Sequence, residues 1–253
     1  MSRRGIGCRA FAAQRGLALV VTLLALSGMM MLGMSALRVV QLSTRIAHAE
    51  RERTHAFYAA EAALADAQRD IVHGSRATLF AQPPASAPVA VARTDAAYTR
   101  EPFVPGICQR NGTRQGLCQS APGQPPIWLT INFDDDSVTA PSVAHGTFTG
   151  ARLPVARLPR YVIEALPAIP RAPDETSLDG LYRITAAGYG PTLRQPVILQ
   201  SVYRRARPAA PSEAGSATQR PPTGRLSWRE ITTWDEMRAD AIRVVLPVDG
   251  TAD

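Results

Sequence analysis

The uncharged run from Leu17 to Leu37 is the feature that most constrains how this chain can fold. It reads LALVVTLLALSGMMMLGMSAL and ends at Arg38. A helix of this length, rising 1.5 Å per residue, covers roughly 30 Å, which is the thickness of one bilayer core. A secretory signal would have a shorter apolar core and a small-x-small cleavage site after it, and this segment has neither. The run therefore predicts a single membrane-spanning helix.

The helix is expected to continue well beyond the span, because no proline occurs before Pro83. Apolar residues then recur in steps of three and four, as they do along one face of a helix. These residues are Leu42, Ile46, Ala49, Ala56, Ala60, Leu64, Ala67 and Ile71. Charged residues such as Asp66 and Arg69 are expected on the remaining surface, and Gly74 suits a C-terminal cap. The pattern predicts one helix from Leu17 to His73, roughly 85 Å long.

Residues 161–164, 181–190 and 195–205 have the composition and alternation of β-strands. Their short connections predict an antiparallel meander with one apolar face, which we expect to pack on the second half of the long helix. The expected apolar positions are Tyr182, Ile184, Ala186, Val197 and Leu199. A further strand is predicted from Ile127 to Phe133. The predicted fold class is α+β: a long N-terminal helix, membrane-spanning in its first half, packed by its second half on a small antiparallel β-sheet.

The composition excludes several classes of function. With 45% hydrophobic and 19% charged residues, wholesale disorder is excluded. The formal net charge of +7 comes entirely from arginine, and four of the arginines precede the span, so little basic excess is left for a nucleic-acid surface. The clusters Arg204-Arg205-Arg207 and Arg225-Arg229 lack interleaved aromatic residues and are predicted to be solvated faces. Nucleic acid is not expected as a partner.

No motif for catalysis or cofactor binding is present. The sequence has no Gly-rich phosphate loop, HExxH or GxSxG pattern, so we expect a non-catalytic protein without a cofactor. His48 and His55 lie seven residues apart on the predicted helix, but metal binding would need further donors. The acidic segment Asp134–Asp136 lacks the central glycine and terminal glutamate of an EF-hand. A turn at a strand end is favoured there, and a weak calcium site remains the alternative.

Three segments of the chain resemble one family, the PilX class of type IV pilus minor pilins. The basic leader and the start of the span, Gln14-Arg15-Gly16-Leu17-Ala18-Leu19-Val20-Val21, are similar to its prepilin start. A second signature is matched by Arg53, Ala56, Phe57, Ala60, Glu61, Ala62 and Leu64. The strand block from Pro159 to Tyr203 is also similar to the C-terminal half of PilX proteins. The resemblance implies a pilin-like fold and a minor pilin that takes part in pilus assembly or initiation and in the tip complex, with roles in adhesion and twitching motility.

The resemblance also implies processing, partners and location. Prepilin peptidase would cleave between Gly16 and Leu17, and Leu17 would be N-methylated. Expected partners are other minor pilins and the major pilin through the N-terminal helix, a tip adhesin, the peptidase and the inner membrane. The C-terminal domain is expected in the periplasm before assembly and at the pilus tip afterwards. In that compartment Cys108 and Cys118 would form a disulfide.

The expected organisation divides the chain into five parts. These are a prepilin leader (1–16), the transmembrane half of the helix (17–37), its periplasmic half (38–73), a pilin-like β domain with proline-rich loops (74–205), and a linker with a C-terminal tail (206–253). Part of the tail, Arg225 to Pro247, is expected to form helix or strand and to dock back.

One departure from the general pilin pattern leaves alternatives open. Typical pilins have phenylalanine first and glutamate fifth after cleavage, where this chain has Leu17 and Val21. PilX-type minor pilins commonly lack that glutamate, and so do the K-type pseudopilins of type II secretion. The alternative is therefore a K-like minor pseudopilin, although these are usually larger and carry a helical insertion. A membrane-anchored periplasmic domain that never polymerises is a third possibility.

Overall fold

The computed structural model describes residues 15–81, 102–166, 180–192, 196–206 and 222–245. The chain divides into two compact units, Met1–Arg51 and Glu52–Asp253. Helix α1 (Arg15–His73) contributes to both and confirms the predicted uninterrupted helix. It ends at Gly74, whose backbone N–H donates to the carbonyl of Arg69 at 2.9 Å.

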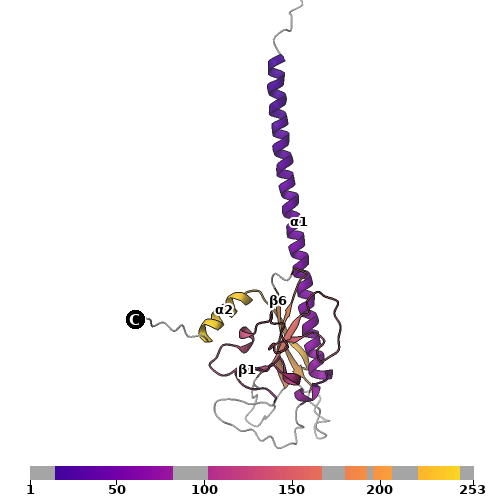
Figure 1. Cartoon of the computed structure of the whole chain (residues 1–253), viewed down its shortest axis with the longest axis vertical. Helices are drawn as coiled ribbons and strands as arrows, with labels where there is room; N and C mark the ends of the chain where they lie inside the picture. Colours follow the sequence, from indigo (N-terminus) through magenta and orange to yellow (C-terminus); the bar gives the residue numbers. More distant parts are fainter. Residues whose placement is uncertain (1–14, 82–101, 167–179, 193–195, 207–221, 246–253) are drawn as a thin grey trace, which may run out of the picture. The chain divides into compact units, whose positions relative to one another are not determined.

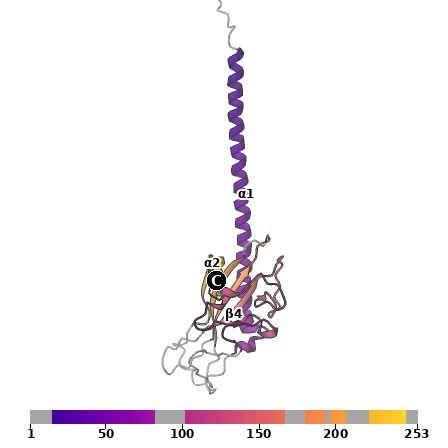
Figure 2. The same cartoon turned by 60° about the vertical axis from the view of Figure 1, so that its left-hand side comes forward.

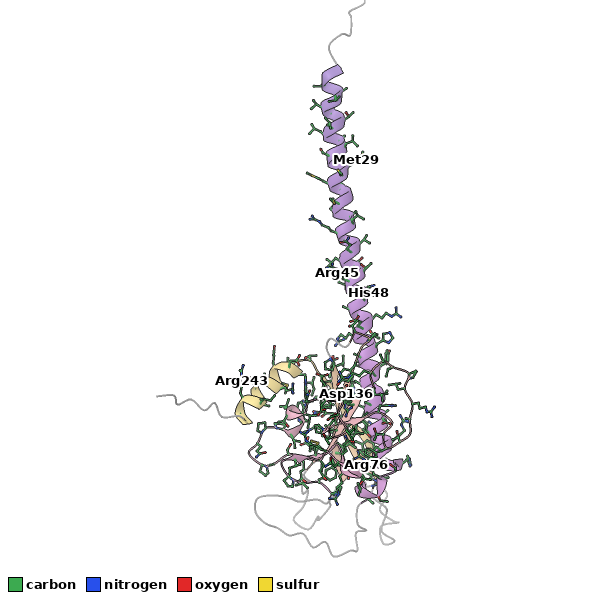
Figure 3. All side chains as sticks on the ribbon, in the orientation of Figure 1. Met29, Arg45, His48, Arg76, Asp136 and Arg243 are labelled. Atoms are coloured by element: carbon green, nitrogen blue, oxygen red, sulfur yellow. A yellow bond between two sulfur atoms is a disulfide. The ribbon has the colours of Figure 1, made fainter. Side chains whose placement is uncertain are left out.

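The first unit contains the apolar part of α1. Within the described residues, α1 is the one helix long and apolar enough to cross a membrane, with an 18-residue stretch of mean hydropathy 2.2. Side chains such as Met29 project outward from it (Figure 3). The few hydroxyl side chains of the span donate to backbone carbonyls of the preceding helical turn, as Thr22 does to Leu19 at 2.9 Å and Ser35 to Leu32 at 2.8 Å. Polar groups inside the span are therefore satisfied within the helix.

The second unit is built on one seven-stranded sheet in the order β1-β2-β4-β5-β6-β7, with β3 paired to β4. Its strands are β1 (Ile107–Cys108), β2 (Leu117–Gln119), β3 (Val143–Ala144), β4 (Arg160–Ala165), β5 (Gly180–Gly188), β6 (Val197–Arg205) and β7 (Gly224–Ile231). Strands β4 to β7 form an antiparallel meander, and β2 runs parallel to β4. The three predicted central strands are confirmed.

Both faces of the sheet are covered (Figures 1 and 2). The part of α1 that follows Glu52 packs on one face, and the short 3₁₀ helix η3 (Ile127–Thr130) and α2 (Trp234–Val245) lie on the other. The first core confirms the predicted pairing of helix and sheet. It contains Ala56, Ala60, Leu64, Ala67 and Ile71 from the helix and Tyr182, Ile184, Ala186, Val197 and Leu199 from the sheet. The molecule is thus an α+β, pilin-like protein.

The strand predicted from Ile127 to Phe133 is wrong. Residues Ile127–Thr130 form η3, because Pro126 precedes them with φ of −53° and its carbonyl accepts from the N–H of Leu129 at 2.9 Å. The apolar side chains that suggested a strand are still buried, on the second face of the sheet. Apolar composition was therefore a correct guide to burial but not to backbone conformation.

The segment beyond residue 222 extends the same sheet. Strand β7 pairs with β6 in antiparallel register, for example Trp228 opposite Ser201, and a bulge interrupts the register beside Tyr203. Helix α2 follows, and its first residue, Trp234, stacks on Trp128 of η3 with ring centroids 5.7 Å apart. The tail therefore docks back as expected, as one strand and one helix. Two further short 3₁₀ helices, η1 (Ala77–Phe80) and η2 (Gly112–Arg114), complete the regular structure of the described residues.

Candidate functional site on the long helix

The proposed cleavage point lies in the first helical turn of the described chain. Helix α1 begins at Arg15, so Gly16 and Leu17 are both helical. The leader residues 1–14 lie outside the described residues. Val21 stands four residues after Leu17, on the same side of the helix, and is exposed. No carboxylate occurs between Leu17 and Leu37, so the span itself offers no counter-charge to an amine at its start.

The alanines of the helix signature let the helix backbone touch strand β5. A Cβ atom added at Gly188 would lie 2.1 Å from the carbonyl oxygen of Ala56 and 2.2 Å from the backbone nitrogen of Ala60. Ala56 and Ala60 are themselves buried, and Leu64 fills the same core one turn further on. Ala62 is half-buried and is not part of that core. Small residues on both elements therefore set the distance between helix and sheet.

The polar and aromatic signature residues hold strand β7. Arg53 forms an ion pair with Glu230 at 2.6 Å. The ring of Phe57 meets the ring of Trp228 edge-on, with centroids 5.8 Å apart. Glu61 accepts hydrogen bonds from the indole N–H of Trp228 and, at 3.3 Å, from the guanidinium of Arg225. Because these ion pairs are partly exposed to solvent, each contributes little to stability alone, and together they fix the position of β7 on the helix.

A buried ion pair at the end of α1 has no counterpart in the sequence-based predictions. Asp70 and Arg76 are almost fully buried, and the Arg76 Nη2 lies 2.6 Å from Asp70 Oδ2. The hydroxyl of Tyr161 donates to the same oxygen at 2.9 Å, and the ring of Phe148 lies 3.7 Å from the guanidinium carbon. Burial raises the pKa of Tyr161 well above its ordinary value, and the negative charge of Asp70 adds to this rise. The six-residue spacing of Asp70 and Arg76 crosses the helix end, so no helical periodicity signals the pair.

Asp66 is also buried, which corrects its predicted place on the helix surface. Its carboxylate accepts from the backbone N–H of Gly146 at 2.7 Å and from the hydroxyl of Thr149. The neighbouring His145 is buried too, and burial lowers its pKa, an effect that the charge of Asp66 partly opposes. Asp66 therefore anchors the loop after β3 to the helix. His48 and His55 remain exposed helix positions, and His48 is labelled in Figure 3.

The predicted disulfide between Cys108 and Cys118 is present. The two cysteines are direct cross-strand partners in the β1–β2 pair. Cys118 is buried, and its parallel partner in β4 is Glu164. The carboxylate of Glu164 accepts from the Ser120 hydroxyl and pairs with Arg183 at 3.0 Å. The bridge thus fastens the outermost strand to the central part of the sheet.

The acidic segment is a turn whose carboxylates meet arginines. Arg157 lies 2.9 Å from Asp134 and 3.1 Å from Asp136. Asp135 accepts from the backbone N–H of Ser137, and the side-chain and backbone hydrogen bonds of Ser137 lower its pKa. Among the described residues, no three acidic, histidine or cysteine side chains converge on a point where a metal ion would fit. The ion pairs with Arg157 explain the acidic side chains of this turn as structural.

Members of both arginine clusters make structural contacts, although Arg225 and Arg229 are exposed, and Arg207 lies outside the described residues. Arg205 donates to the carbonyl of Ala77 at 2.9 Å, and Arg229 donates to Gln200 at 2.6 Å. Since Arg225 binds Glu61, these side chains tie β6 and β7 to their neighbours. The prediction of merely solvated faces is therefore incomplete.

Two models of one protein family match the chain. The model described as PilX N-terminal matches residues 15–65, which is most of α1 including the signature. The model described as Type IV pilus assembly protein PilX C-term matches residues 114–205, which end with the last residue of β6. No curated protein and no solved structure is significantly similar to the chain.

Replacing Gly188 with alanine tests the close approach of helix and sheet. Because the added methyl group falls where the helix backbone already lies, we expect Gly188→Ala to lower the free energy of unfolding by about 1–3 kcal/mol. Denaturant unfolding of the full-length chain in detergent measures this change. Ser227→Thr adds a methyl group at an exposed position of β7 and is expected to have an effect below about 0.5 kcal/mol. Equal effects of the two variants would contradict the contact.

A double-mutant cycle tests the ion pair of Asp70 and Arg76. We expect Asp70→Asn and Arg76→Met each to reduce the free energy of unfolding by about 3–5 kcal/mol, because each leaves a buried charge without its partner. The double variant removes both charges and should lose clearly less than the sum of the single variants. Thermal and denaturant unfolding provide the measurements. Additive losses would show that the two groups do not interact.

Proposed function

The chain belongs to the PilX family of type IV pilus assembly proteins, and we propose that it works at or near the pilus tip, in a priming complex with other minor pilins. The family has a structural role, and the apolar first half of α1 fits a single-pass membrane anchor. The observation that carries the proposal is Val21, the apolar residue at the position where typical pilins have a glutamate.

The position of Val21 matters because of the charge created by cleavage. Processing after Gly16 would leave a charged amine on Leu17 at membrane depth, where an unpaired charge is costly. In an ordinary pilin, the fifth-residue glutamate of an incoming subunit neutralises the amine of the subunit above it. Val21 provides no such group, so this chain gains nothing from entering beneath another subunit. A glutamate-bearing subunit that enters below it still neutralises the amine of Leu17. This asymmetry favours a position for this chain at the end of the fibre.

The rest of the molecule is consistent with that position. The disulfide between Cys108 and Cys118 suits an oxidising compartment, as expected for a domain that is periplasmic before assembly and extracellular afterwards. The partners implied are other minor pilins, the major pilin and a tip adhesin. Adhesion and twitching motility would then depend on this chain through the fibre that it helps to start.

Processing gives the first test. If the leader is a prepilin leader, mass spectrometry of the membrane form should find N-methylated Leu17 as the first residue. Gly16→Leu should block the cut, because a side chain would crowd the extended backbone in the peptidase, while Ala13→Ser in the leader should leave processing unchanged. An intact Met1 terminus in peptidase-positive cells would contradict the assignment.

Imaging of sheared fibres tests the position in the fibre. A tag on the C-terminal domain should label one end of each fibre, since Val21 disfavours interior positions. Val21→Glu restores the missing carboxylate and should allow label along the shaft, whereas Val21→Leu should keep the label at the end. If the tagged protein without substitutions labels fibres evenly along the shaft, at the density of the major pilin, the proposal is wrong.

A further inference from the structure

The loop that joins β1 to β2 carries an asparagine followed by glycine at its apex. Asn111, Gly112 and Thr113 are all exposed, and Gly112 opens the short helix η2. We propose that Asn111 is a site of spontaneous deamidation, by which the folded protein acquires aspartate or isoaspartate at this position. The reaction needs only water, and it would change the charge and the backbone of an exposed loop.

The chemistry uses atoms of two neighbouring residues. The backbone nitrogen of Gly112 loses its proton to solvent and forms a bond to Cγ of Asn111. The bond from Cγ to Nδ2 then breaks, and Nδ2 takes up a proton from solvent and leaves as ammonia. The resulting five-membered succinimide then adds one water. Opening the ring at Cγ gives aspartate with the normal peptide bond. Opening it at the main-chain carbonyl gives isoaspartate, in which the backbone runs through the side-chain carbon.

Three properties make this asparagine reactive. Gly112 has no side chain to shield its nitrogen, and its φ of +58° is a conformation that favours glycine. The Asn111 side chain makes no capping hydrogen bond to η2, so its amide is not held away from the attacking nitrogen. Both residues are exposed, so water and base reach them.

Contacts at both ends of the loop are expected to slow the deamidation of Asn111. The N–H of Gln109 donates to the carbonyl of Leu117 at 3.0 Å, and the disulfide of Cys108 closes the hairpin one residue further out. Arg76 donates to the carbonyl of Thr113 at 2.9 Å from inside the molecule. Asn111 has ψ of 145°, an extended conformation from which its backbone must rotate before the ring can close. The rate of deamidation should therefore increase when the loop becomes more flexible.

The second of the two asparagines in the sequence provides a control within the same molecule. Asn132 is exposed, but its Oδ1 accepts from the backbone N–H of Asp134 at 3.1 Å. The residue that follows it is Phe133, whose bulky side chain is buried. Its side chain is engaged and the next nitrogen is shielded, so Asn132 should stay intact.

The product would alter the surface of the loop. Asn111 lies between Arg110 and Arg114, both exposed, and either product adds a carboxylate beside them. The isoaspartate form also adds one carbon atom to the backbone of a loop held at both flanks. Subunits of different age would thus present different charge and shape at this apex.

The experiment follows both asparagines over time in the full-length, oxidised protein in detergent at mildly alkaline pH. Peptide mapping by mass spectrometry detects the gain of about 1 Da, and isoaspartyl methyltransferase labels the isoaspartate form. We expect Asn111 to convert and Asn132 to remain. Gly112→Ala should slow conversion by on the order of tenfold, because a side chain then shields the attacking nitrogen. Reduction of the disulfide should accelerate conversion.

A synthetic peptide spanning Gln109 to Leu117 supplies the reference rate. If Asn111 stays intact while the peptide converts, the proposal is overturned. Equal conversion of Asn111 and Asn132 would also overturn it, since that result indicates reaction in unfolded chains rather than at this loop. A rate unchanged by Gly112→Ala would exclude attack by the Gly112 nitrogen.

Discussion

The contact on which the second unit depends is the direct approach of helix α1 to strand β5. The backbone at Ala56 and Ala60 lies against Gly188, so close that no side chain fits between them. Burial of the neighbouring leucine, isoleucine and tyrosine side chains follows from this spacing, because interiors are packed without large gaps. A larger residue at any of these three positions would push the helix outward and open the core along its length. The small residues of the signature are thus a packing requirement.

Polar groups fix the position of helix α1 along and around its own axis, which the apolar contact alone does not determine. An alanine face sets a distance but allows the helix to slide or rotate. Asp66 and Asp70, one helical turn apart, accept hydrogen bonds from the loop after β3 and from Arg76 and Tyr161, and so they determine register. Towards the start of the packed segment, Arg53 and Glu61 bind β7 through ion pairs that are partly exposed to solvent. The helix is therefore held firmly where it ends and more loosely where it enters the second unit.

The sequence predicted the elements that local patterns encode and missed those that depend on distant partners. The long helix, the face formed by Tyr182, Ile184 and Ala186, and the pairing of Cys108 with Cys118 were all predicted. Burial of Asp66 depends on a loop about eighty residues away, and sequence spacing carries no sign of it. Composition favours a strand at Ile127, whereas the chain forms a 3₁₀ helix there after Pro126. The contacts of Arg53, Phe57 and Glu61 with β7 were missed because the tail has no periodicity before it pairs.

Amide hydrogen exchange of the full-length protein in detergent tests most directly whether helix and sheet form one cooperative unit. If the contact at Gly188 locks them together, the amides of α1 from Ala56 to Ile71 should exchange as slowly as those of β5, and Gly188→Ala should speed up both sets by the same factor. Slow exchange in β5 with fast exchange in that helical segment would contradict the account, because the sheet would then be stable without the helix.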